Sequence, residues 1–269
     1  MAAGDFLSRV ELISPSEWAK GKIESVQEYA LLAAQSLANL FRRPLYVADA
    51  VQQADLIGFG SLSIVMLAGF FTGAVLAQNS AATLERFGSL SLIGQLVSIG
   101  MVRQLGPVIT GLLVAGRNAS GMASELGSMV VTEQIDAMRA LGTDPTKKLV
   151  TPRVVSTIFM LFFLTIIADL LGLVGGGFVA IFLLGLDSHQ YWTTSWQILR
   201  YPDIFTGLVQ PIFYGFLFST VGCYFGMNAK GGTQGVGRGT TQAVVVSSVM
   251  ILVVDFFLTR FLDLVLGPM

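Results

Sequence analysis

Long apolar stretches alternate with shorter polar segments along the chain. Five of the apolar stretches reach the length of about 20 residues that a membrane-spanning helix needs. The third is longer than required and contains GLVGGG at 172–177, which predicts tilt or a local break in that helix. The pattern therefore predicts an all-α integral membrane protein with five transmembrane helices, at residues 56–78, 91–116, 154–184, 205–228 and 240–265.

A different pattern precedes the first span. Ser14, Pro15 and Glu17 match the signature of a helix start. Apolar residues then recur at steps of three or four, which places them on one helical face. We interpret residues 15–42 as an amphipathic helix lying in the membrane surface, and residues 46–269 as the transmembrane domain. The alternative is a soluble helix packed on a domain. The apolar positions are Ile23, Val26, Ala30, Ala33, Leu37 and Leu40, within an interfacial region of residues 1–45.

The distribution of Lys and Arg predicts the topology. With a cytoplasmic N-terminus, twelve of the sixteen fall in the N-terminal segment and in the loops 117–153 and 229–239. Three fall outside, and Arg103 lies within the second span. The positive-inside rule therefore favours a cytoplasmic N-terminus and, after five spans, a periplasmic C-terminus.

Composition excludes several kinds of site. Charged residues make up 12% of the chain, whereas a soluble domain has about 25%. The single cysteine and the single histidine, His189, predict neither a disulfide framework nor a metal site. GGTQGVGRGTT at 231–241 lacks the Lys and Ser/Thr of a phosphate loop and reads as a flexible loop, so we expect no ATPase site in this chain. We also expect no catalytic residues, because no intramembrane nucleophile has an evident base.

The longest polar stretch lies between the second and third spans. Apolar residues from Met122 to Leu141 fall near one helical face, and Gly142 and Pro145 end the pattern. We interpret residues 120–141 as a short amphipathic cytoplasmic helix that serves as a docking element. The alternative is a connector resting on the lipid, which its acidic residues disfavour.

Three charges fall at membrane depth, namely Arg103, Asp169 and Asp255. Such groups are paired, buried against protein or open to a water-filled cavity. Arg103 suits a lipid phosphate, and it equally suits a structural ion pair with Asp255. The G-x-x-x-G patterns at 69–73, 172–176 and 222–226 favour close helix packing, either within a bundle or in a dimer.

Several of these segments resemble one family throughout. AGRNASGMASELGSMVVTEQIDAMRALGTDP followed by LVTPR resembles the signature of the MlaE/YrbE permeases. GGTQGVGRGTTQAVVVSSVMILVVDFFLT resembles their C-terminal block, and FTGAVLAQ and VRQLGPVITGLLVAGR resemble their first two spans. The resemblance implies the membrane subunit of an ABC transporter that moves phospholipid or a related lipid between membranes.

The resemblance also implies partners and a location. We expect a homodimer in a bacterial inner membrane, a separate cytoplasmic ABC-type ATPase that binds ATP and Mg, and a periplasmic hexameric ring of MCE-domain protein. A STAS-domain protein is a further partner in some systems, and no nucleic acid is expected. The chain itself would carry no cofactor.

Motif positions assign residues to these expected roles. The lipid pocket would be lined by Leu76, Leu84, Phe87, Arg103, Gln104 and Leu105. The coupling helix would present Glu125, Glu133, Asp136 and Arg139 to the ATPase. This chain departs from many relatives in having Gln104 after the arginine and Gln78-Asn79 at the end of the first span, which bears on lipid preference.

Two other functions remain open from the sequence. The chain could be a passive membrane anchor for an MCE-domain assembly, which would not need a docking helix for an ATPase. It could also be a proton-driven transporter, in which Asp169 or Asp255 would titrate during turnover.

Overall fold

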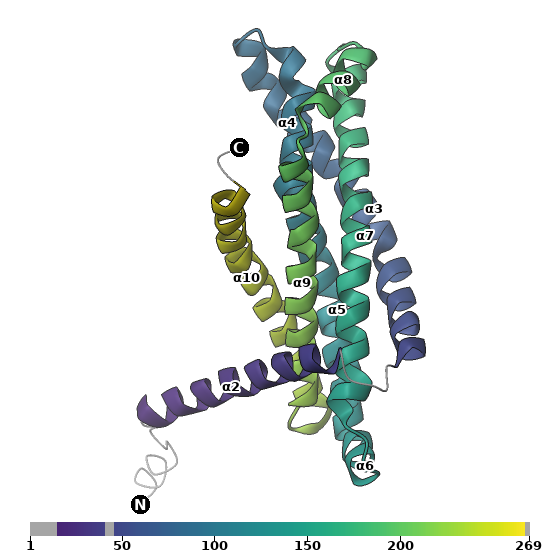
Figure 1. Ribbon diagram of the computed structural model, residues 1–269, viewed down its shortest axis with the longest axis vertical. Coiled ribbons are helices and arrows are strands. Elements are labelled where there is room, and N and C mark those ends of the chain that lie inside the picture. The colour runs from purple at the N-terminus through teal and green to yellow at the C-terminus, as the bar shows by residue number, and fades with distance from the viewer. Residues whose placement is uncertain (1–14, 41–45, 267–269) are drawn as a thin grey trace, which may run out of the picture.

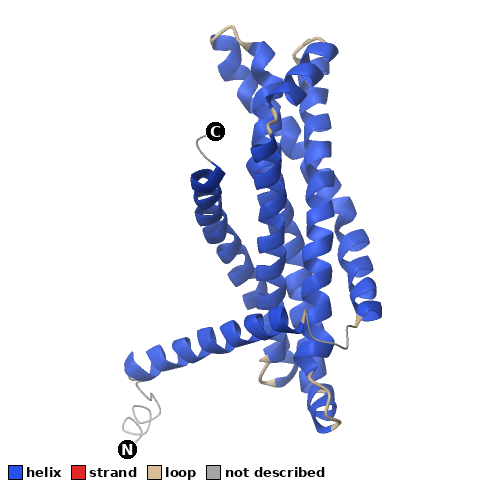
Figure 2. Cartoon of the chain, in the orientation of Figure 1, coloured by secondary structure: helices blue, strands red, loops and turns tan. Residues whose placement is uncertain are grey.

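The computed structural model describes residues 15–40 and 46–266, and helices make up nearly all of them (Figures 1 and 2). Within these ranges no residue belongs to a β-strand. The predicted start signal at Ser14 lies outside the described residues, as does the side chain of Glu17. The helices are α2 (Pro15–Asn39), α3 (Val47–Arg86), α4 (Ile93–Gly100), α5 (Gly106–Val131), α6 (Gln134–Ala140), α7 (Thr151–Phe178), α8 (Ser188–Ile198), α9 (Tyr201–Met227) and α10 (Gly232–Leu266).

Short turns of other helix types join some of these helices without a break. A 3-10 turn, η1 (Leu90–Leu92), leads into α4, and a π-helical turn, η2 (Met101–Leu105), joins α4 to α5. Two more π turns, η3 (Thr146–Val150) and η4 (Val179–Leu183), flank α7. The second and third predicted spans are thus continuous rods, and the GLVGGG segment lies inside α7 without breaking it.

Four helical rods are long and apolar enough to cross a membrane, at Val47–Arg86, Leu90–Val131, Thr146–Leu183 and Tyr201–Met227. They match the first four predicted spans, of which the third and fourth extend one residue beyond their rods. The fifth predicted span falls on α10, a 35-residue helix that is not among these four, so the total of five spans stays a prediction. The segment 232–241, interpreted as a flexible loop, forms the first turns of α10.

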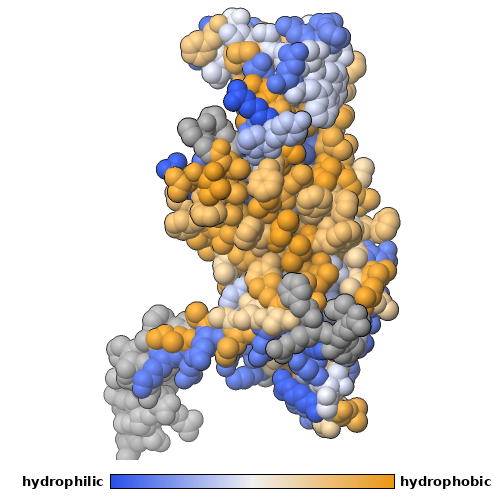
Figure 3. All heavy atoms as spheres, viewed as in Figure 1, coloured by the Kyte–Doolittle hydropathy of each residue, from blue (hydrophilic) through white to orange (hydrophobic). Residues whose placement is uncertain are grey.

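The surface of the molecule is divided into zones along its long axis. Figure 3 shows a belt of apolar side chains around the middle, with polar side chains gathered at both ends. Exposed aromatic and aliphatic residues of α3, α7 and α10 lie on this surface, such as Phe71, Phe159 and Phe256. Exposing such a belt to water would be energetically unfavourable, so this surface is suited to contact with lipid.

Helix α2 lies across the direction of the other long helices, near the end that carries α6 (Figure 1). Its Tyr29 hydroxyl is 3.0 Å from the Thr220 hydroxyl of α9, and the Tyr29 and Tyr224 rings meet edge to face. Ile23 and Val26 remain exposed on α2. These contacts anchor one part of α2 to the bundle, and its position in the membrane surface stays a prediction.

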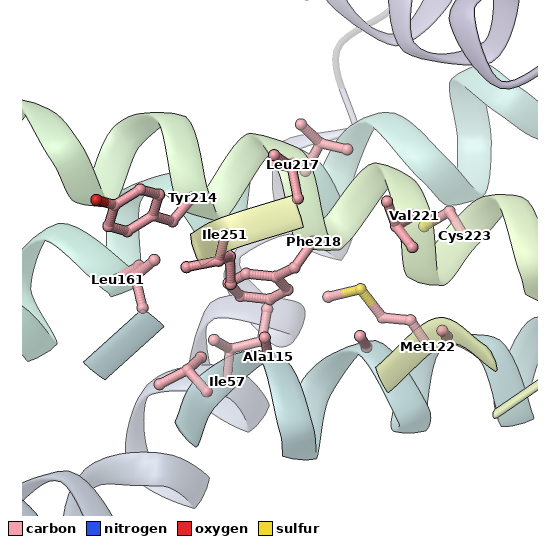
Figure 4. Close-up of a cluster of buried hydrophobic side chains, with 14 of the residues drawn as sticks. Ile57, Ala115, Met122, Leu161, Tyr214, Leu217, Phe218, Val221, Cys223 and Ile251 are labelled. Atoms are coloured by element: carbon pink, nitrogen blue, oxygen red, sulfur yellow. The ribbon is translucent and has the colours of Figure 1, made fainter. Parts of the chain in front are cut away.

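The central core draws on five helices. Ile57, Ala115, Leu161, Phe218 and Ile251 come from α3, α5, α7, α9 and α10 in turn, and all are at most 2% exposed (Figure 4). A second buried cluster, around Met101 and Tyr191, joins η2 and α8 at the end of the molecule opposite α6 (Figure 1).

The G-x-x-x-G patterns pack helices within the chain. A Cβ atom on Gly73 of α3 would lie 1.8 Å from the carbonyl oxygen of Gly172 in α7. A Cβ atom on Gly222 of α9 would lie 2.9 Å from the carbonyl oxygen of Ala119 in α5. Because these glycines let two backbones approach closely, the patterns serve the bundle, which was one of the two predicted uses.

The predicted amphipathic helix over 120–141 is not a single helix, and that interpretation was wrong in its extent. Helix α5 runs on to Val131, and only Gln134–Ala140 forms a separate short helix. Met122 and Leu126 face the core rather than an external partner. The reason is that α9 packs closely against this part of α5, where Gly226 meets Leu126.

Candidate functional site

The π turn η2 determines where the side chains of the second span point. The backbone N–H of Gly106 donates to the carbonyl of Met101, five residues back, and Pro107 follows in the first turn of α5. A π turn inserts one extra residue into a helix and rotates the side chains that follow it, and such turns are frequent at functional sites. Arg103, Gln104 and Leu105 all lie in this turn.

Arg103 lies between two carboxylates from other helices. Its guanidinium forms an ion pair with Asp263 of α10 and lies 3.8 Å from Asp203 at the start of α9. The Arg103 side chain is 23% exposed, and that of Asp263 is 31% exposed. The expected pairing of Arg103 with Asp255 is therefore wrong, although the interpretation as an ion pair holds.

The carboxylate of Asp255 instead accepts hydrogen bonds from two uncharged side chains. It accepts a hydrogen bond of 2.6 Å from the Gln104 side-chain amide and another of 2.6 Å from the Tyr214 hydroxyl. A glutamate at position 104 would put a second carboxylate against Asp255, whereas the glutamine amide donates to it. The uncharged amide of Gln104 is therefore compatible with the carboxylate of Asp255 beside it.

The residues of α10 that make these contacts are regularly spaced. Asp255, Thr259 and Asp263 are four residues apart, so they lie in one row on the helix, which we name the polar row. Thr259 contacts both Gln104, at 3.4 Å, and the side-chain amide of Gln210 in α9, at 3.1 Å. The polar row thereby ties α10 to η2 and α9. Sequence reasoning missed Thr259, Asp263, Asp203 and Tyr214, although the four-residue spacing on α10 was a usable signal.

The opposite side of η2 borders a hollow. Its volume is about 400 Å³, within the range of small-molecule sites, and it lies between α3 and Leu105. Two predicted pocket residues, Leu76 and Leu105, meet here, together with the polar residue Asn79. We call it the α3 hollow; its lining residues are Ala68, Phe71, Thr72, Val75, Leu76, Asn79 and Leu105.

The other predicted pocket residues lie elsewhere within the chain. Arg103 and Gln104 face the polar row rather than the α3 hollow. Leu84 packs on the second buried cluster, and Phe87, just beyond α3, is 77% exposed. Within the chain, the six residues are therefore divided among separate places, and their shared role as a pocket stays a prediction.

The predicted coupling residues also have distinct environments. Glu125 forms an ion pair of 2.8 Å with Arg153, which is buried at the start of α7. Asp136 and Arg139 pair with each other at 3.0 Å on the exposed face of α6. Glu133, between α5 and α6, has a left-handed backbone with φ of 59°. Glu125 thus ties two helices together, while the other three lie on an accessible surface.

Asp169 occupies the middle of α7 and is 93% buried, with one carboxylate oxygen lacking a hydrogen-bond partner among the described residues. That oxygen touches the backbone of Gly106, because a Cβ atom there would lie 1.6 Å from it. Asp169 therefore packs directly behind the π turn. Among the described residues, no group of three His, Cys, Asp or Glu side chains could hold a metal ion.

Several long apolar helices, an apolar belt, and polar groups held inside the spans define a multi-pass membrane protein. A family model described as "Permease MlaE" matches residues 50–261, and the chain belongs to that family.

Curated relatives agree with this assignment. The chain is 41% identical to a probable ABC transporter permease protein of Rickettsia typhi over 89% of its own length and 92% of the relative. It is 31% identical to the intermembrane phospholipid transport system permease protein MlaE of Haemophilus influenzae, over 78% of the chain and 80% of the relative. It is 32% identical to the chloroplastic protein TRIGALACTOSYLDIACYLGLYCEROL 1 of Arabidopsis thaliana, over 91% of the chain and 71% of the relative. The chain is therefore an ABC transporter permease of the MlaE family, a class that works with an ATPase partner.

Proposed function

We propose that this permease moves phospholipid, or a related lipid, between a bacterial inner membrane and a periplasmic ring of MCE-domain protein. The observation that carries the proposal is the family match over 50–261, together with a relative named for intermembrane phospholipid transport. ATP would be hydrolysed by a separate cytoplasmic ATPase, with Mg bound there. This chain would act as a homodimer, and a STAS-domain protein is a further proposed partner.

The α3 hollow and η2 support a path for lipid. Leu76 and Leu105 offer apolar contact for acyl chains, and Asn79 adds a polar group at the same place. Arg103 is partly exposed, so a lipid phosphate could exchange with its carboxylate partners. A second protomer would bring the α3 hollow and Arg103 into one cavity, along with Leu84 and Phe87.

The accessible surface around α6 supports the coupling role. Leu141 is 84% exposed and follows Asp136 and Arg139 on this short segment. Glu125 and Arg153 connect α5 to α7 directly behind it. We infer that a push on α6 by the ATPase moves α5 and α7 together, and that η2 transmits this motion to the polar row.

Purification from the native membrane tests the proposal as a whole. The tagged chain would be isolated gently, and mass spectrometry would identify every retained protein and lipid. An ABC-type ATPase, an MCE-domain protein and phospholipid are expected together. An MCE-domain protein retained without any ATPase would instead favour the passive anchor.

The headgroup role of Arg103 needs a matched pair of variants. Arg103→Ala and Asp263→Ala each remove one member of the same ion pair. If Arg103 also binds phosphate, Arg103→Ala lowers retained phospholipid and transport well below the level of Asp263→Ala. Equal effects of the two variants would leave Arg103 with a structural role only.

A further inference from the structure

A second hollow lies near the other end of α3. Its volume is about 300 Å³, and it is formed by the last residues of α2, the first turn of α3 and the η3–α7 junction. Along α3, Ala50 of this hollow is 26 residues from Leu76 of the α3 hollow. At 1.5 Å per residue that separation is about 39 Å. We name it the α2 hollow; it is lined by Asn39, Leu40, Tyr46, Val47, Ala50, Lys147, Thr151, Pro152 and Val155.

The two hollows lie at different depths along α3. The hydrocarbon core of a bilayer is about 30 Å thick, so sites separated by about 39 Å along a spanning helix belong to opposite leaflets. Asn39 and Leu40, at the end of α2, line the α2 hollow. Helix α2 runs across the direction of the bundle (Figure 1). With α2 in its predicted position in the membrane surface, the α2 hollow would open at the boundary between the bilayer and water, in the leaflet nearest α2.

The interior of the α2 hollow is suited to hydrocarbon. Val47, Ala50 and Val155 supply apolar walls from two spans. Asn39, only 8% exposed, and Thr151, 7% exposed, add two buried polar side chains. A peptide segment inserted here would leave most of its backbone groups unpaired against apolar walls, whereas an acyl chain would leave none. The Asn39 side-chain amide is suited to donate to an ester carbonyl that joins an acyl chain to glycerol, whereas the Thr151 hydroxyl already donates to the Thr146 carbonyl at 3.2 Å.

The charges beside the α2 hollow suit an anionic group. Lys147 contributes to its lining, and the neighbouring Lys148 ammonium lies 4.3 Å from the centre of the Tyr46 ring. Lys148 also pairs with Asp49. Lysines close to a membrane surface attract anionic lipid headgroups.

We propose that the α2 hollow binds one phospholipid of the adjoining leaflet, with an acyl chain inside and its phosphate beside Lys147 and Lys148. This site is separate from the α3 hollow of the proposed transport path, and its occupancy does not require ATP. The bound lipid would join α2 to α3 and α7 where these elements meet, in addition to the direct contacts of Tyr29.

Photo-crosslinking of the purified full-length chain tests this site. The probe is phosphatidylglycerol with a photoactivatable diazirine in one acyl chain, offered in detergent at limiting amounts. Adducts mapped by mass spectrometry are expected on the peptides around Ala50 and Val155. Adducts no more frequent there than on the exposed α10 residue Phe256 would overturn the proposal.

A filling variant and its neighbour give the matched control. Ala50→Phe would fill the hollow and abolish the adducts, whereas Val51→Phe adds the same ring at a position that is 63% exposed and should leave them unchanged. Val155→Phe fills the hollow from α7 and covers the case in which Ala50→Phe fails to fold. Adducts that persist in a folded filling variant would place the lipid elsewhere.

The proposed contact between Lys147 and the lipid phosphate is tested separately. Lys147→Gln should weaken retention of phosphatidylglycerol about fivefold, the contribution of one lysine near an anionic surface. A diacylglycerol probe, which has no phosphate, should bind equally to Lys147→Gln and to the unaltered chain. Loss of both probes in Lys147→Gln would contradict a phosphate contact. Because no ATPase is present in this experiment, its result is independent of lipid transport.

Discussion

At the scale of single residues, glycines set the distance between helices. Gly73 and Gly175 each face a backbone carbonyl of a neighbouring helix, at 1.8 Å and 1.9 Å from an added Cβ atom. A backbone cannot move aside as a flexible side chain can. By contrast, an added Cβ atom on Gly121 of α5 would meet nothing within 4 Å. An added side chain is therefore expected to disturb the packing at Gly73 and Gly175 but not at Gly121.

Gly73→Ala is expected to destabilise the chain, since overpacking typically costs about 1–3 kcal/mol. The matched control Gly121→Ala should be neutral or stabilising by up to about 1 kcal/mol, the helix propensity difference. Thermal unfolding in detergent, followed by circular dichroism, measures both. An unfolding temperature for Gly73→Ala at or above that of the unaltered chain would contradict the close α3–α7 contact.

Tyr191 of α8 gives a pH-dependent prediction outside the four membrane-crossing rods. Its ring is buried and its hydroxyl donates to the Leu173 carbonyl at 2.8 Å. Burial raises the pKa of Tyr191 to about 12. The unfolded chain ionises near pH 10, so the stabilisation is complete below about pH 10 and is lost as pH rises to about 12.

The unfolding temperature should therefore fall between about pH 10 and pH 12. Tyr191→Phe would be less stable at neutral pH, having lost a hydrogen bond worth about 1 kcal/mol, yet its stability should decline less in this alkaline range. Parallel alkaline curves for the two proteins would show that Tyr191 ionises as freely when folded as when unfolded.

At the scale of elements, breaks and turns decide which side chains are accessible. The left-handed backbone at Glu133 ends α5 and starts α6 in a new direction. The π turn η2 sends Leu105 to the α3 hollow and Arg103 to the polar row. At both places, the side chains point in directions that they would not take in an unbroken α-helix.

Glu133→Gly should stabilise the chain by about 1 kcal/mol, because a left-handed conformation is unfavourable for a residue with a Cβ atom. Glu133→Ala removes the same carboxylate and keeps the strain, so it should not stabilise. Thermal unfolding compares the two. If the carboxylate also contacts the ATPase, both variants would reduce the ATPase activity of the assembled complex equally.

At the scale of the whole molecule, the two polar ends should face opposite sides of the membrane. Leu141 beside α6 is 84% exposed, and Tyr201 at the start of α9 is 92% exposed. The only cysteine, Cys223, is fully buried, so the unaltered chain should give little background labelling. Single cysteines at these exposed positions can therefore report the orientation.

Tyr201→Cys should react with a membrane-impermeant maleimide in intact spheroplasts, and Leu141→Cys should react only after lysis. This outcome is expected because twelve of the sixteen basic residues fall on the side assigned to the cytoplasm. Labelling of Leu141→Cys in intact spheroplasts would reverse the predicted topology.

The sequence by itself determined the helical class and the first four spans, because a helix crossing lipid must present about 20 apolar residues in a row. It also determined the family, through long motifs such as AGRNASGMASELG and LVTPR. It did not determine the extent of α5, since Met122 and Leu126 have the same spacing on a docking face as on a buried face.

Only the tertiary structure decided the partners of the buried charges. Arg103 could reach either Asp255 or Asp263, which lie on one face of α10, and the packing of α10 against η2 selected Asp263. The α3 and α2 hollows likewise depend on how separate helices meet. Spacing along a chain fixes which residues share a face. The choice between faces depends on packing between distant segments, which local periodicity does not encode.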